Sequence, residues 1–203
     1  MIDYTTIAQD FDKTRGYVWP CVKRFLESNN HKTDSSVLEA GCGNGRNLKY
    51  AQSLGYTDVA GFDICPEFVS ICREKKGLNV FCGNILEPLS KKYDIIMAVA
   101  VIHHLETEGQ RQRAIKNLID GLNPGGKLMF SVWSYEKYSS KAQRHFELGD
   151  NYVPWHSRDG NTVVAQRYYY IYNESLIKDT LASIGVDYEL YWEEQNWIVT
   201  IKN

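Results

Sequence analysis

The sequence predicts an α/β protein with a mainly parallel sheet and helices on both of its faces. Two observations predict this fold class. Short apolar runs alternate along the chain with stretches of helical periodicity, which is the pattern of strand–helix–strand units. The run over residues 93–101 is apolar almost throughout, as a strand covered on both faces should be. We expect the 203 residues to form a single domain, with an N-terminal helical segment over residues 1–33 and an insertion over residues 134–167.

The expected elements follow one another in an order that suits this fold class. After an amphipathic segment that ends near Leu26, the expected strands are residues 37–40, 58–63, 79–82, 93–101, 127–133, 186–192 and 197–202, the last two joined as a hairpin. The expected helices are residues 44–54, 66–76, 107–122 and 174–184. Pro66 occupies a first helical turn, where proline is tolerated. Residues 134–167 have no clear period, so we expect a surface insertion there.

Composition excludes several classes of protein. The chain is 43% hydrophobic and 24% charged, which is far from the composition of disordered chains. It contains no run of about 18 apolar residues that could cross a membrane, and the first residues do not resemble a secretory signal. A net charge of −2 excludes nucleic-acid binding by bulk charge alone. The five cysteines form no CxxC pair, so we expect reduced thiols, a cytoplasmic location and no metal site.

A glycine-rich turn follows the first expected strand. Gly41, Gly43 and Gly45 stand at alternate positions, where the backbone can approach a ligand closely and the next helix points its amides at it. A dinucleotide-binding fingerprint would need a further glycine at position 46, where Arg46 stands. A tight strand-to-helix turn would also explain these glycines. A nicotinamide oxidoreductase is therefore disfavoured, and a non-catalytic binding module is a further alternative.

Polar residues at the ends of the neighbouring strands suit an adenosine ligand. Asp63 ends the second strand, where a carboxylate can accept both ribose hydroxyls or, alternatively, cap the following helix. Glu39 places negative charge where an ammonium group would lie. Asn84 either bonds an adenine edge, with Ile64 and Ile85 against the ring, or is a turn residue.

Together these residues resemble the S-adenosylmethionine site of the class I methyltransferases. The resemblance implies a Rossmann-like, seven-stranded mixed sheet whose last strand is antiparallel, and S-adenosylhomocysteine as a product. The cofactor-binding residues expected on this basis are Glu39, Gly41, Gly43, Gly45, Asp63, Ile64, Asn84, Ile85 and Ala100.

Absent motifs narrow the methyl acceptor. Residues 100–104 read Ala-Val-Ile-His-His, whereas enzymes that methylate an exocyclic amine commonly carry Asn/Asp-Pro-Pro-aromatic there. Methylation at C5 of a pyrimidine needs a thiolate nucleophile, and this turn has no cysteine. An oxygen acceptor remains, and a carboxylate fits best if an arginine lies nearby.

Further motifs resemble those of the eukaryotic tRNA wobble-uridine carboxymethyl methyltransferases. They are Tyr4…Arg15…Trp19-Pro20, Val101-Ile102-His103-His104, Pro124-Gly125-Gly126, Val132-Trp133, Val153-Pro154-Trp155-His156, Arg167-Tyr168-Tyr169 and Asn196-Trp197. The resemblance implies that the enzyme methyl-esterifies 5-carboxymethyluridine at the wobble position of the tRNA anticodon loop. An O-methyltransferase acting on a small-molecule carboxylate is the alternative.

The acceptor carboxylate is ionised at neutral pH, because its intrinsic pKa is about 4, and no general base is required. We expect Arg15 and His103 to be catalytic, with Arg15 clamping the carboxylate through two hydrogen bonds. The expected substrate-binding residues are Arg15, Trp133, Trp155, His156, Arg167 and Tyr168. Structural roles are the alternatives: an ion pair of Arg15 with Asp10 or Asp12, a turn cap at His103, core packing of Trp133 and strand packing of Tyr168.

The expected strand over Asn79 to Cys82 lies at one edge of the implied sheet. Leu78, Val80 and Phe81 make it short, uncharged and apolar, which invites pairing with a strand of another protein. The family that the chain resembles works with a small zinc-binding activator subunit that adds its sheet to this edge. We therefore expect a heterodimer, unless helix ends or the insertion cover the edge.

Overall fold

The computed structural model describes residues 7–28, 33–136, 146–156 and 162–203. Parts of the expected N-terminal segment and of the expected insertion, including Tyr4, therefore lie outside the described residues. The helices are α1 (Ala8–Thr14), α2 (Pro20–Glu27), α3 (Arg46–Ser53), α4 (Pro66–Ser70) with a π-helical turn η1 (Ile71–Lys75), the 3₁₀ turn η2 (Ile102–His104), α5 (Glu108–Asp120) and α7 (Glu174–Ala182). The strands are β1 (Val37–Ala40), β2 (Val59–Asp63), β3 (Asn79–Cys82), β4 (Tyr93–Val99), β5 (Leu122–Trp133), β6 (Gly149–His156), β7 (Val163–Ile171), β8 (Tyr188–Glu193) and β9 (Asn196–Lys202).

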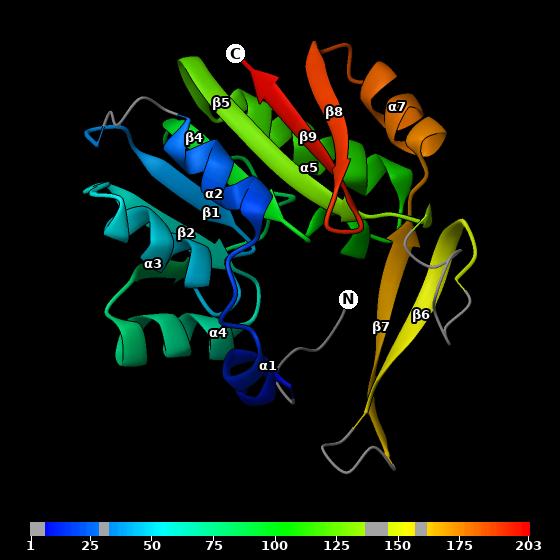
Figure 1. Ribbon diagram of the computed structural model, residues 1–203, viewed down its shortest axis with the longest axis horizontal. Helices are drawn as coiled ribbons and strands as arrows, with labels where there is room; N and C mark the ends of the chain where they lie inside the picture. Colours follow the sequence, from blue (N-terminus) through cyan, green and yellow to red (C-terminus); the bar gives the residue numbers. More distant parts are fainter. Residues whose placement is uncertain (1–6, 29–32, 137–145, 157–161) are drawn as a thin grey trace.

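Seven strands form one sheet in the order β3-β2-β1-β4-β5-β9-β8 (Figure 1). Strands β1 to β5 pair in parallel, whereas β9 runs antiparallel to both β5 and β8. This topology confirms the expected seven-stranded mixed sheet with an antiparallel last strand. The strand order reverses between β1 and β4, and ligands of open α/β sheets bind at such a switch point, beyond the carboxyl ends of the strands.

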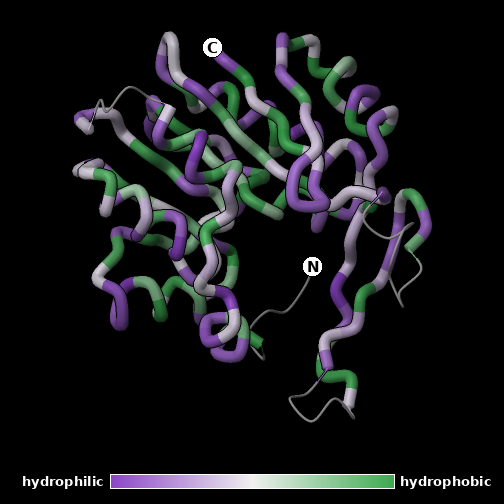
Figure 2. Tube along the Cα trace, viewed as in Figure 1, coloured by the Kyte–Doolittle hydropathy of each residue, from purple (hydrophilic) through white to green (hydrophobic). Residues whose placement is uncertain are grey.

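Two hydrophobic cores cover the two faces of the sheet, and hydrophobic residues follow the central strands (Figure 2). Strand β4 shows how the sequence achieves this. Ile96 and Ala98 pack with α5 and α7, whereas Ile95 and Met97 pack with α2, α3 and α4. Successive strand side chains point to opposite faces, so a continuous apolar run supplies both cores.

Several element boundaries differ from the expectation, and those around β4, α5 and β5 bear on the site. Strand β4 ends at Val99 instead of Val101, because Ala100 turns the chain with a φ of 58°. Helix α5 ends at Asp120, and Leu122 already pairs with Tyr93, so β5 begins before the Pro124-Gly125-Gly126 turn. Among the described residues, no helix is long and apolar enough to cross a membrane.

Where no periodicity was visible, the structure has an antiparallel hairpin of β6 and β7, which projects from one end of the main sheet (Figure 1). One of its faces carries Val153, Tyr169 and Ile171, which pack against Trp133, and the opposite face is largely exposed. Polar and aromatic residues mix on both strands, so the alternation of period two is hidden in the sequence. The outcome is a wall beside the carboxyl end of β5.

Candidate functional site

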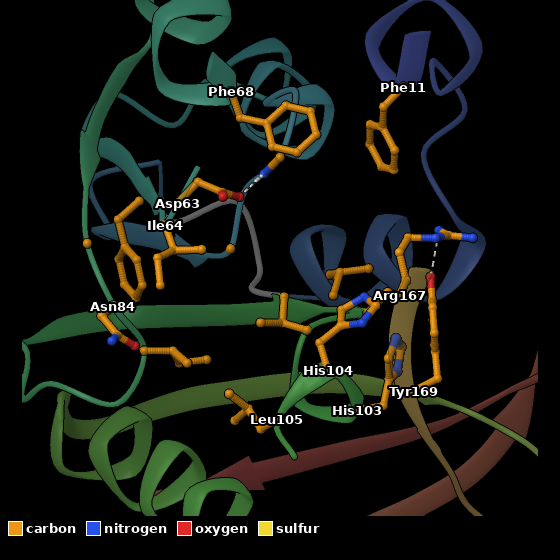
Figure 3. A pocket seen from close by; sticks show the side chains of 18 of the residues that line it. Phe11, Asp63, Ile64, Phe68, Asn84, His103, His104, Leu105, Arg167 and Tyr169 are labelled. Carbon is orange, nitrogen blue, oxygen red and sulfur yellow. Dashed lines mark hydrogen bonds between the residues drawn. The ribbon is translucent and has the colours of Figure 1, made fainter. Parts of the chain in front are cut away.

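A pocket of about 500 Å³ opens at the carboxyl ends of β1, β2, β4 and β5. Its far side is formed by the β6–β7 hairpin, and α1 lies on the side opposite the sheet (Figure 3). The expected site residues that line it are Arg15, Gly41, Gly43, Asp63, Ile64, Asn84, Ile85, Ala100, His103, Trp133 and Arg167. The expected site residues outside the lining are Glu39, Gly45, Trp155, His156 and Tyr168.

The glycine turn has one open position, Gly43, between two crowded positions. A Cβ atom at Gly43 would have only the Phe11 ring near it, at 3.7 Å, so this stretch of backbone is accessible from the pocket. A Cβ atom at Gly45 would lie 2.4 Å from Leu78 Cδ1, and the residue has a φ of 72°. Gly43 therefore leaves room for a ligand, whereas Gly45 is a packing residue beneath the turn, which is why it does not line the pocket.

Asp63 connects the glycine turn to the end of β2. Its Oδ2 accepts a hydrogen bond from the Gly43 amide over 2.8 Å, and its Oδ1 accepts one from the Cys65 amide over 2.9 Å. Burial raises the pKa of this carboxyl group, and the hydrogen bonds from the backbone amides oppose that rise. Each carboxylate oxygen can accept a further bond, so Asp63 holds the turn and can also receive ribose hydroxyls.

The adenine end of the pocket is apolar with one amide. Ile64 is 43% exposed at its edge and Ile85 lies at the base. The side-chain Oδ1 of Asn84 accepts a hydrogen bond from the Leu86 amide over 3.0 Å. Asn84 is thus a turn residue, as the structural alternative held, and it also lines the pocket. This combination suits a flat heterocycle with a polar edge.

Ala100 carries backbone strain at the mouth of the pocket. It is a non-glycine residue with a φ of 58°, and its amide donates to Oγ of the buried Ser131 over 3.0 Å. Non-glycine residues in this region occur mainly where the surrounding structure enforces them and cluster at functional sites. The turn directs the chain into η2, which carries His103 and His104.

Glu39 differs from the expectation. It is 2% exposed and lies behind the glycine turn, where its Oε1 accepts a hydrogen bond from Nδ2 of Asn47 over 2.6 Å. Burial raises the pKa of Glu39 to about 8. Its Oε2 and the Oδ1 of Asn47 have no hydrogen-bond partner among the described residues. A protonated Glu39 can donate to that amide oxygen, so the pair supports the turn from behind instead of lining the pocket.

The opposite end of the pocket holds a buried guanidinium. Arg167 of β7 is 8% exposed, and its Nη1 donates to the Tyr169 hydroxyl over 2.8 Å (Figure 3). Its Nε is buried and has no hydrogen-bond partner among the described residues. Its carbon Cζ lies 4.8 Å from the centre of the Trp155 ring. A buried cation with a spare donor is costly unless a ligand supplies an acceptor.

Two histidines of η2 lie beside this arginine in opposite tautomers. Nδ1 of His103 accepts a hydrogen bond from the Trp133 amide over 3.1 Å, so the proton of the neutral ring is on Nε2. Nδ1 of His104 lies 2.9 Å from the Tyr168 carbonyl oxygen and must donate, so its lone pair is on Nε2. Burial lowers the pKa of His104 to about 4, so it is neutral at pH 7. His103 thus accepts a hydrogen bond from the end of β5, a contact different from the turn cap that the alternative held, and it also lines the pocket.

Tyr168, which was expected to bind substrate, does not line the pocket. Arg167 and Tyr169 point toward the pocket, and since neighbouring strand residues face opposite ways, Tyr168 points away. Its hydroxyl donates to the Glu106 carbonyl oxygen over 3.0 Å, behind the wall. His156 is exposed near the end of β6 and does not line the pocket. Trp155 lies one layer behind the lining, against Arg167.

Arg15 is exposed and lines the mouth of the pocket, with its guanidinium 6.0 Å from the centre of the Trp155 ring. The alternative of an ion pair with Asp12 is wrong, since Asp12 pairs with Lys76 and accepts a hydrogen bond from Nδ2 of Asn44. The same amide donates to the Arg15 carbonyl oxygen over 2.9 Å. The segment after α1 is thereby fixed to the glycine turn.

Several lining residues escaped the sequence reasoning. They are Phe11, Trp19, Arg46, Phe62, Phe68, His104 and Tyr169. The sequence could have identified two of them as lining residues. His104 lies in the motif that supplied His103, and the strand period places Tyr169 on the face of Arg167. Trp19 stands in the N-terminal motif of the family resemblance, but its place in the pocket, like that of Phe11, depends on how that segment packs over the sheet.

The residues present fit S-adenosylmethionine. Gly43 offers open backbone, Asp63 spare acceptor capacity, and Ile64 with Asn84 a flat site with a polar edge. Within the described ranges, no group of three or more His, Cys, Asp or Glu residues could hold a metal ion.

Sequence comparisons identify relatives of this chain. A family described as a methyltransferase domain matches residues 13–184. A putative methyltransferase of Encephalitozoon cuniculi is 33% identical over 177 residues, covering 83% of this chain and 78% of that protein. The tRNA (carboxymethyluridine(34)-5-O)-methyltransferase of Schizosaccharomyces pombe is 29% identical over 222 residues, covering 98% and 94%. A human protein named probable tRNA methyltransferase 9B is 35% identical over 153 residues, covering 75% of this chain and 32% of that protein. The chain thus spans about a third of the length of the human relative.

Solved structures share the fold. The sugar N-methyltransferase KedS8 from a Streptoalloteichus species superposes with a TM-score of 0.71 at 15% identity, covering 97% of this chain and 93% of that chain. A complex of DhpI with S-adenosylhomocysteine gives 0.70 at 15% identity, covering 97% and 91%. The family match over residues 13–184 and the Encephalitozoon relative show that this chain belongs to the methyltransferase-domain family.

Proposed function

We propose that this protein is an S-adenosylmethionine-dependent tRNA methyltransferase that converts 5-carboxymethyluridine at the wobble position to its methyl ester. The observation that carries the proposal is the guanidinium of Arg167, a pocket-lining residue whose buried Nε has no hydrogen-bond partner among the described residues. It is the group that an acceptor carboxylate needs in a dry site. The name and 98% coverage of the Schizosaccharomyces pombe relative support the tRNA substrate.

The cofactor half of the pocket extends from the glycine turn to Asn84. Gly43 would face the methionine part, Asp63 the ribose hydroxyls, and Ile64 and Ile85 the adenine ring. When bound, S-adenosylmethionine supplies an electrophilic methyl group on a sulfonium and leaves as S-adenosylhomocysteine. The chain's own contribution on this side is to hold the turn rigid through the bonds of Asp63 to the Gly43 and Cys65 amides.

The acceptor half would hold the carboxylate on Arg167. Its Nη1 is engaged by Tyr169, which leaves the Nε–Nη2 edge for two parallel hydrogen bonds. Arg15, the clamp expected from sequence, is exposed at the mouth, where a carboxylate would remain in water. We therefore assign the clamp to Arg167. His103 holds the end of β5 through the Trp133 amide, and neither histidine is needed as a base.

The chemistry suits a closed, weakly polar site. An ionised carboxylate and a sulfonium become a neutral ester and a neutral thioether, and this loss of charge is favoured where water is excluded. Trp133, Tyr169 and His103 stack at this end and exclude water. The clamp must orient the anion without binding it too tightly, because tighter ground-state binding alone would not raise kcat.

Mass spectrometry of nucleosides tests the proposal. Transfer RNA carrying 5-carboxymethyluridine is incubated with the protein and S-adenosylmethionine, and the methyl ester is measured after digestion. Arg167→Ala serves as the inactive variant, and unmodified transfer RNA as the control substrate. Ester formation on small carboxylic acids but not on the RNA would favour the small-molecule alternative and overturn this proposal.

The same proposal includes a zinc-binding activator subunit that pairs with β3. This strand is at the sheet edge, with Phe81 42% exposed and Cys82 also exposed, while Val80 is buried. Such an edge can accept another strand. Co-expression should raise the soluble yield and give a heterodimer by light scattering. A fully soluble and active monomer expressed alone would contradict this part.

A cytoplasmic location completes the proposal. All five cysteines are free thiols, and Sγ of Cys42 and of Cys72 lie 4.0 Å and 3.2 Å from the same Gly43 carbonyl oxygen without forming a disulfide. Neighbouring free thiols are typical of a reducing compartment. Fractionation of cells expressing the tagged protein checks this.

A further inference from the structure

Three guanidinium groups line the pocket, from Arg46 at the glycine turn, through Arg15 at the mouth, to Arg167 in the β6–β7 wall. In the part of the chain that the structure describes, none of them forms an ion pair with a carboxylate. Like charges gathered in a low-dielectric cavity repel one another. Such an arrangement is stable when the ligands bring the anions.

The ligands of the proposed reaction bring anions of different kinds. The cofactor carries a carboxylate on its methionine part, and the modified uridine carries the acceptor carboxylate. A nucleotide inside an RNA chain is also flanked by phosphodiesters, which a free nucleoside lacks. The three arginines can therefore be matched with three anions.

Burial and position distinguish the three arginines. Arg46 begins α3 directly after Gly45, beside the glycine turn where the methionine part of the cofactor would lie. Arg167 is 8% exposed and faces the acceptor. Arg15 is the exposed one. A phosphodiester of a bound RNA stays largely in water, so it fits an exposed cation at the mouth better than a buried one.

The guanidinium groups of Arg15 and Arg167 both lie near the aromatic ring of Trp155. The guanidinium carbon of Arg167 lies 4.8 Å from the ring centre and that of Arg15 lies 6.0 Å from it. The backbone of Arg15 is fixed by the hydrogen bond from Asn44, so its side chain starts from a defined point above the glycine turn. The two guanidiniums thus lie against the same ring, close enough to meet a base substituent and a neighbouring phosphate of one ligand.

We propose that Arg15 binds a phosphodiester next to the target nucleotide, so that it selects an RNA chain over a free nucleoside, while Arg167 holds the acceptor carboxylate. This inference rests on the proposed function, because it takes an RNA-borne carboxylate as the substrate. It makes Arg15 a specificity-determining residue and separates its role from that of Arg167.

Neutral phosphate analogues test the inference. Anticodon stem-loops carrying 5-carboxymethyluridine are made with a methylphosphonate at the linkage on the 5′ side or on the 3′ side of the target. Each substitution removes the charge of one phosphate. Binding in the presence of S-adenosylhomocysteine is measured by fluorescence anisotropy, and kcat/KM by ester formation, for the wild type, Arg15→Ala and Arg15→Lys. Lys13→Ala is the matched control, since Lys13 is an exposed cation of α1 outside the pocket lining.

One of the two methylphosphonates should weaken wild-type binding about 10-fold and should not weaken Arg15→Ala further. Arg15→Ala should also reduce the slope of log Kd against log salt by about 0.7, the value for one phosphate of a single strand. Arg15→Lys should keep part of the affinity, because a lysine still binds phosphate as a point charge. Lys13→Ala should behave like the wild type.

Additive losses from Arg15→Ala and both methylphosphonates would overturn the inference, because the two changes would then act independently. Weaker binding of S-adenosylhomocysteine by Arg15→Ala, measured by calorimetry, would assign Arg15 to the cofactor carboxylate instead. A wild type that binds stem-loops through Arg15 but makes no ester would overturn the proposed function and leave the phosphate contact standing. If the enzyme forms the ester but neither methylphosphonate acts through Arg15, the proposed function stands and the phosphate contact of Arg15 is overturned.

Discussion

The amide of Gly43 donates a hydrogen bond to Oδ2 of Asp63 over 2.8 Å, so the glycine turn after β1 and the acid at the end of β2 form one unit. The other oxygen of Asp63 holds the Cys65 amide at the entrance to α4. The carboxylate that suits the ribose therefore also sets the shape of the turn.

Asp63→Ala should reduce both stability and cofactor binding. Two amides lose their acceptor, which costs about 1–3 kcal/mol in the free energy of unfolding. Urea denaturation and calorimetry with S-adenosylhomocysteine measure the two effects. Asp63→Asn keeps one acceptor oxygen, so it should retain more stability while still binding the nucleoside weakly. Unchanged affinity in Asp63→Ala would show that the carboxylate does not contact the ribose.

Alanine at two glycines should separate stability from binding. Gly45→Ala places a Cβ atom 2.4 Å from Leu78 Cδ1 and 2.9 Å from Cys72 Sγ, which should cost about 1–3 kcal/mol by overpacking. Gly43→Ala meets only Phe11 at 3.7 Å, so its cost is mainly that of the positive φ, about 1–2 kcal/mol. It should nevertheless abolish cofactor binding by filling the open face of the turn. Equal affinity losses in the two variants would contradict this division.

Glu39 should make the protein less stable as pH rises. Burial raises the pKa of its carboxyl group in the folded state to about 8, from a value of 4.5. Between these values the folded state keeps a proton that the unfolded state has released, so the free energy of unfolding falls with rising pH. Glu39→Gln, which keeps the size and the bond to Asn47, should remove this part of the pH dependence and be relatively more stable at about pH 8. Parallel pH profiles from urea denaturation would contradict a protonated Glu39.

Arg167 should be more sensitive to substitution than its neighbours. Arg167→Lys loses the two-donor edge in a buried site, so kcat/KM should fall about 100-fold. Tyr169→Phe removes the hydroxyl that accepts from Nη1, so the arginine is less well oriented and kcat should fall by about 10-fold. Tyr168→Phe is the matched control on the opposite face of β7; it should lower the melting temperature and leave kcat unchanged. A larger loss in Tyr168→Phe than in Tyr169→Phe would reverse the assignment of the two faces.

The rate of methyl transfer should not depend on the protonation state of a histidine. Burial lowers the pKa of His104 to about 4, and the free acceptor carboxyl is ionised above about pH 5. The value of kcat/KM should therefore be flat from about pH 5.5 to 7. A change of kcat/KM with pH that has an apparent pKa near 6.5 would indicate a titrating histidine and an acid–base step.

Local pattern was sufficient for much of the fold. The apolar run of β4 predicts a parallel strand that is buried on both faces. The glycines after β1 predict a ligand-binding turn, because positive φ angles favour glycine. The antiparallel pairing of β9 with β5 followed from the family resemblance, whereas the residues at the strand ends already predicted an adenosine site. The hairpin of β6 and β7 shows no such pattern, because aromatic and polar residues mix on both of its strands.

The acceptor end was harder to predict for a physical reason. Whether Arg15 or Arg167 is buried depends on how two distant segments pack, and their residue types do not reveal it. The face on which Tyr168 lies depends on strand register alone. The sequence pointed to Arg167 and Tyr168, whereas Arg167 and Tyr169 are the residues of this strand that line the pocket.

The base of β7 is joined to the end of β5 just after Ile171, where the Tyr172 amide donates to the Trp133 carbonyl oxygen and the Tyr172 carbonyl oxygen accepts from the Tyr135 amide. The number of residues between this anchor and Arg167 can therefore change only by two if Arg167 is to stay on the same face of the strand. A single inserted residue there would turn the guanidinium outward and bring its neighbour in. Residues can be added on the far side of Arg167, toward the hairpin end, without disturbing this count, so relatives are free to vary in the reach of the hairpin while the spacing of its base is preserved.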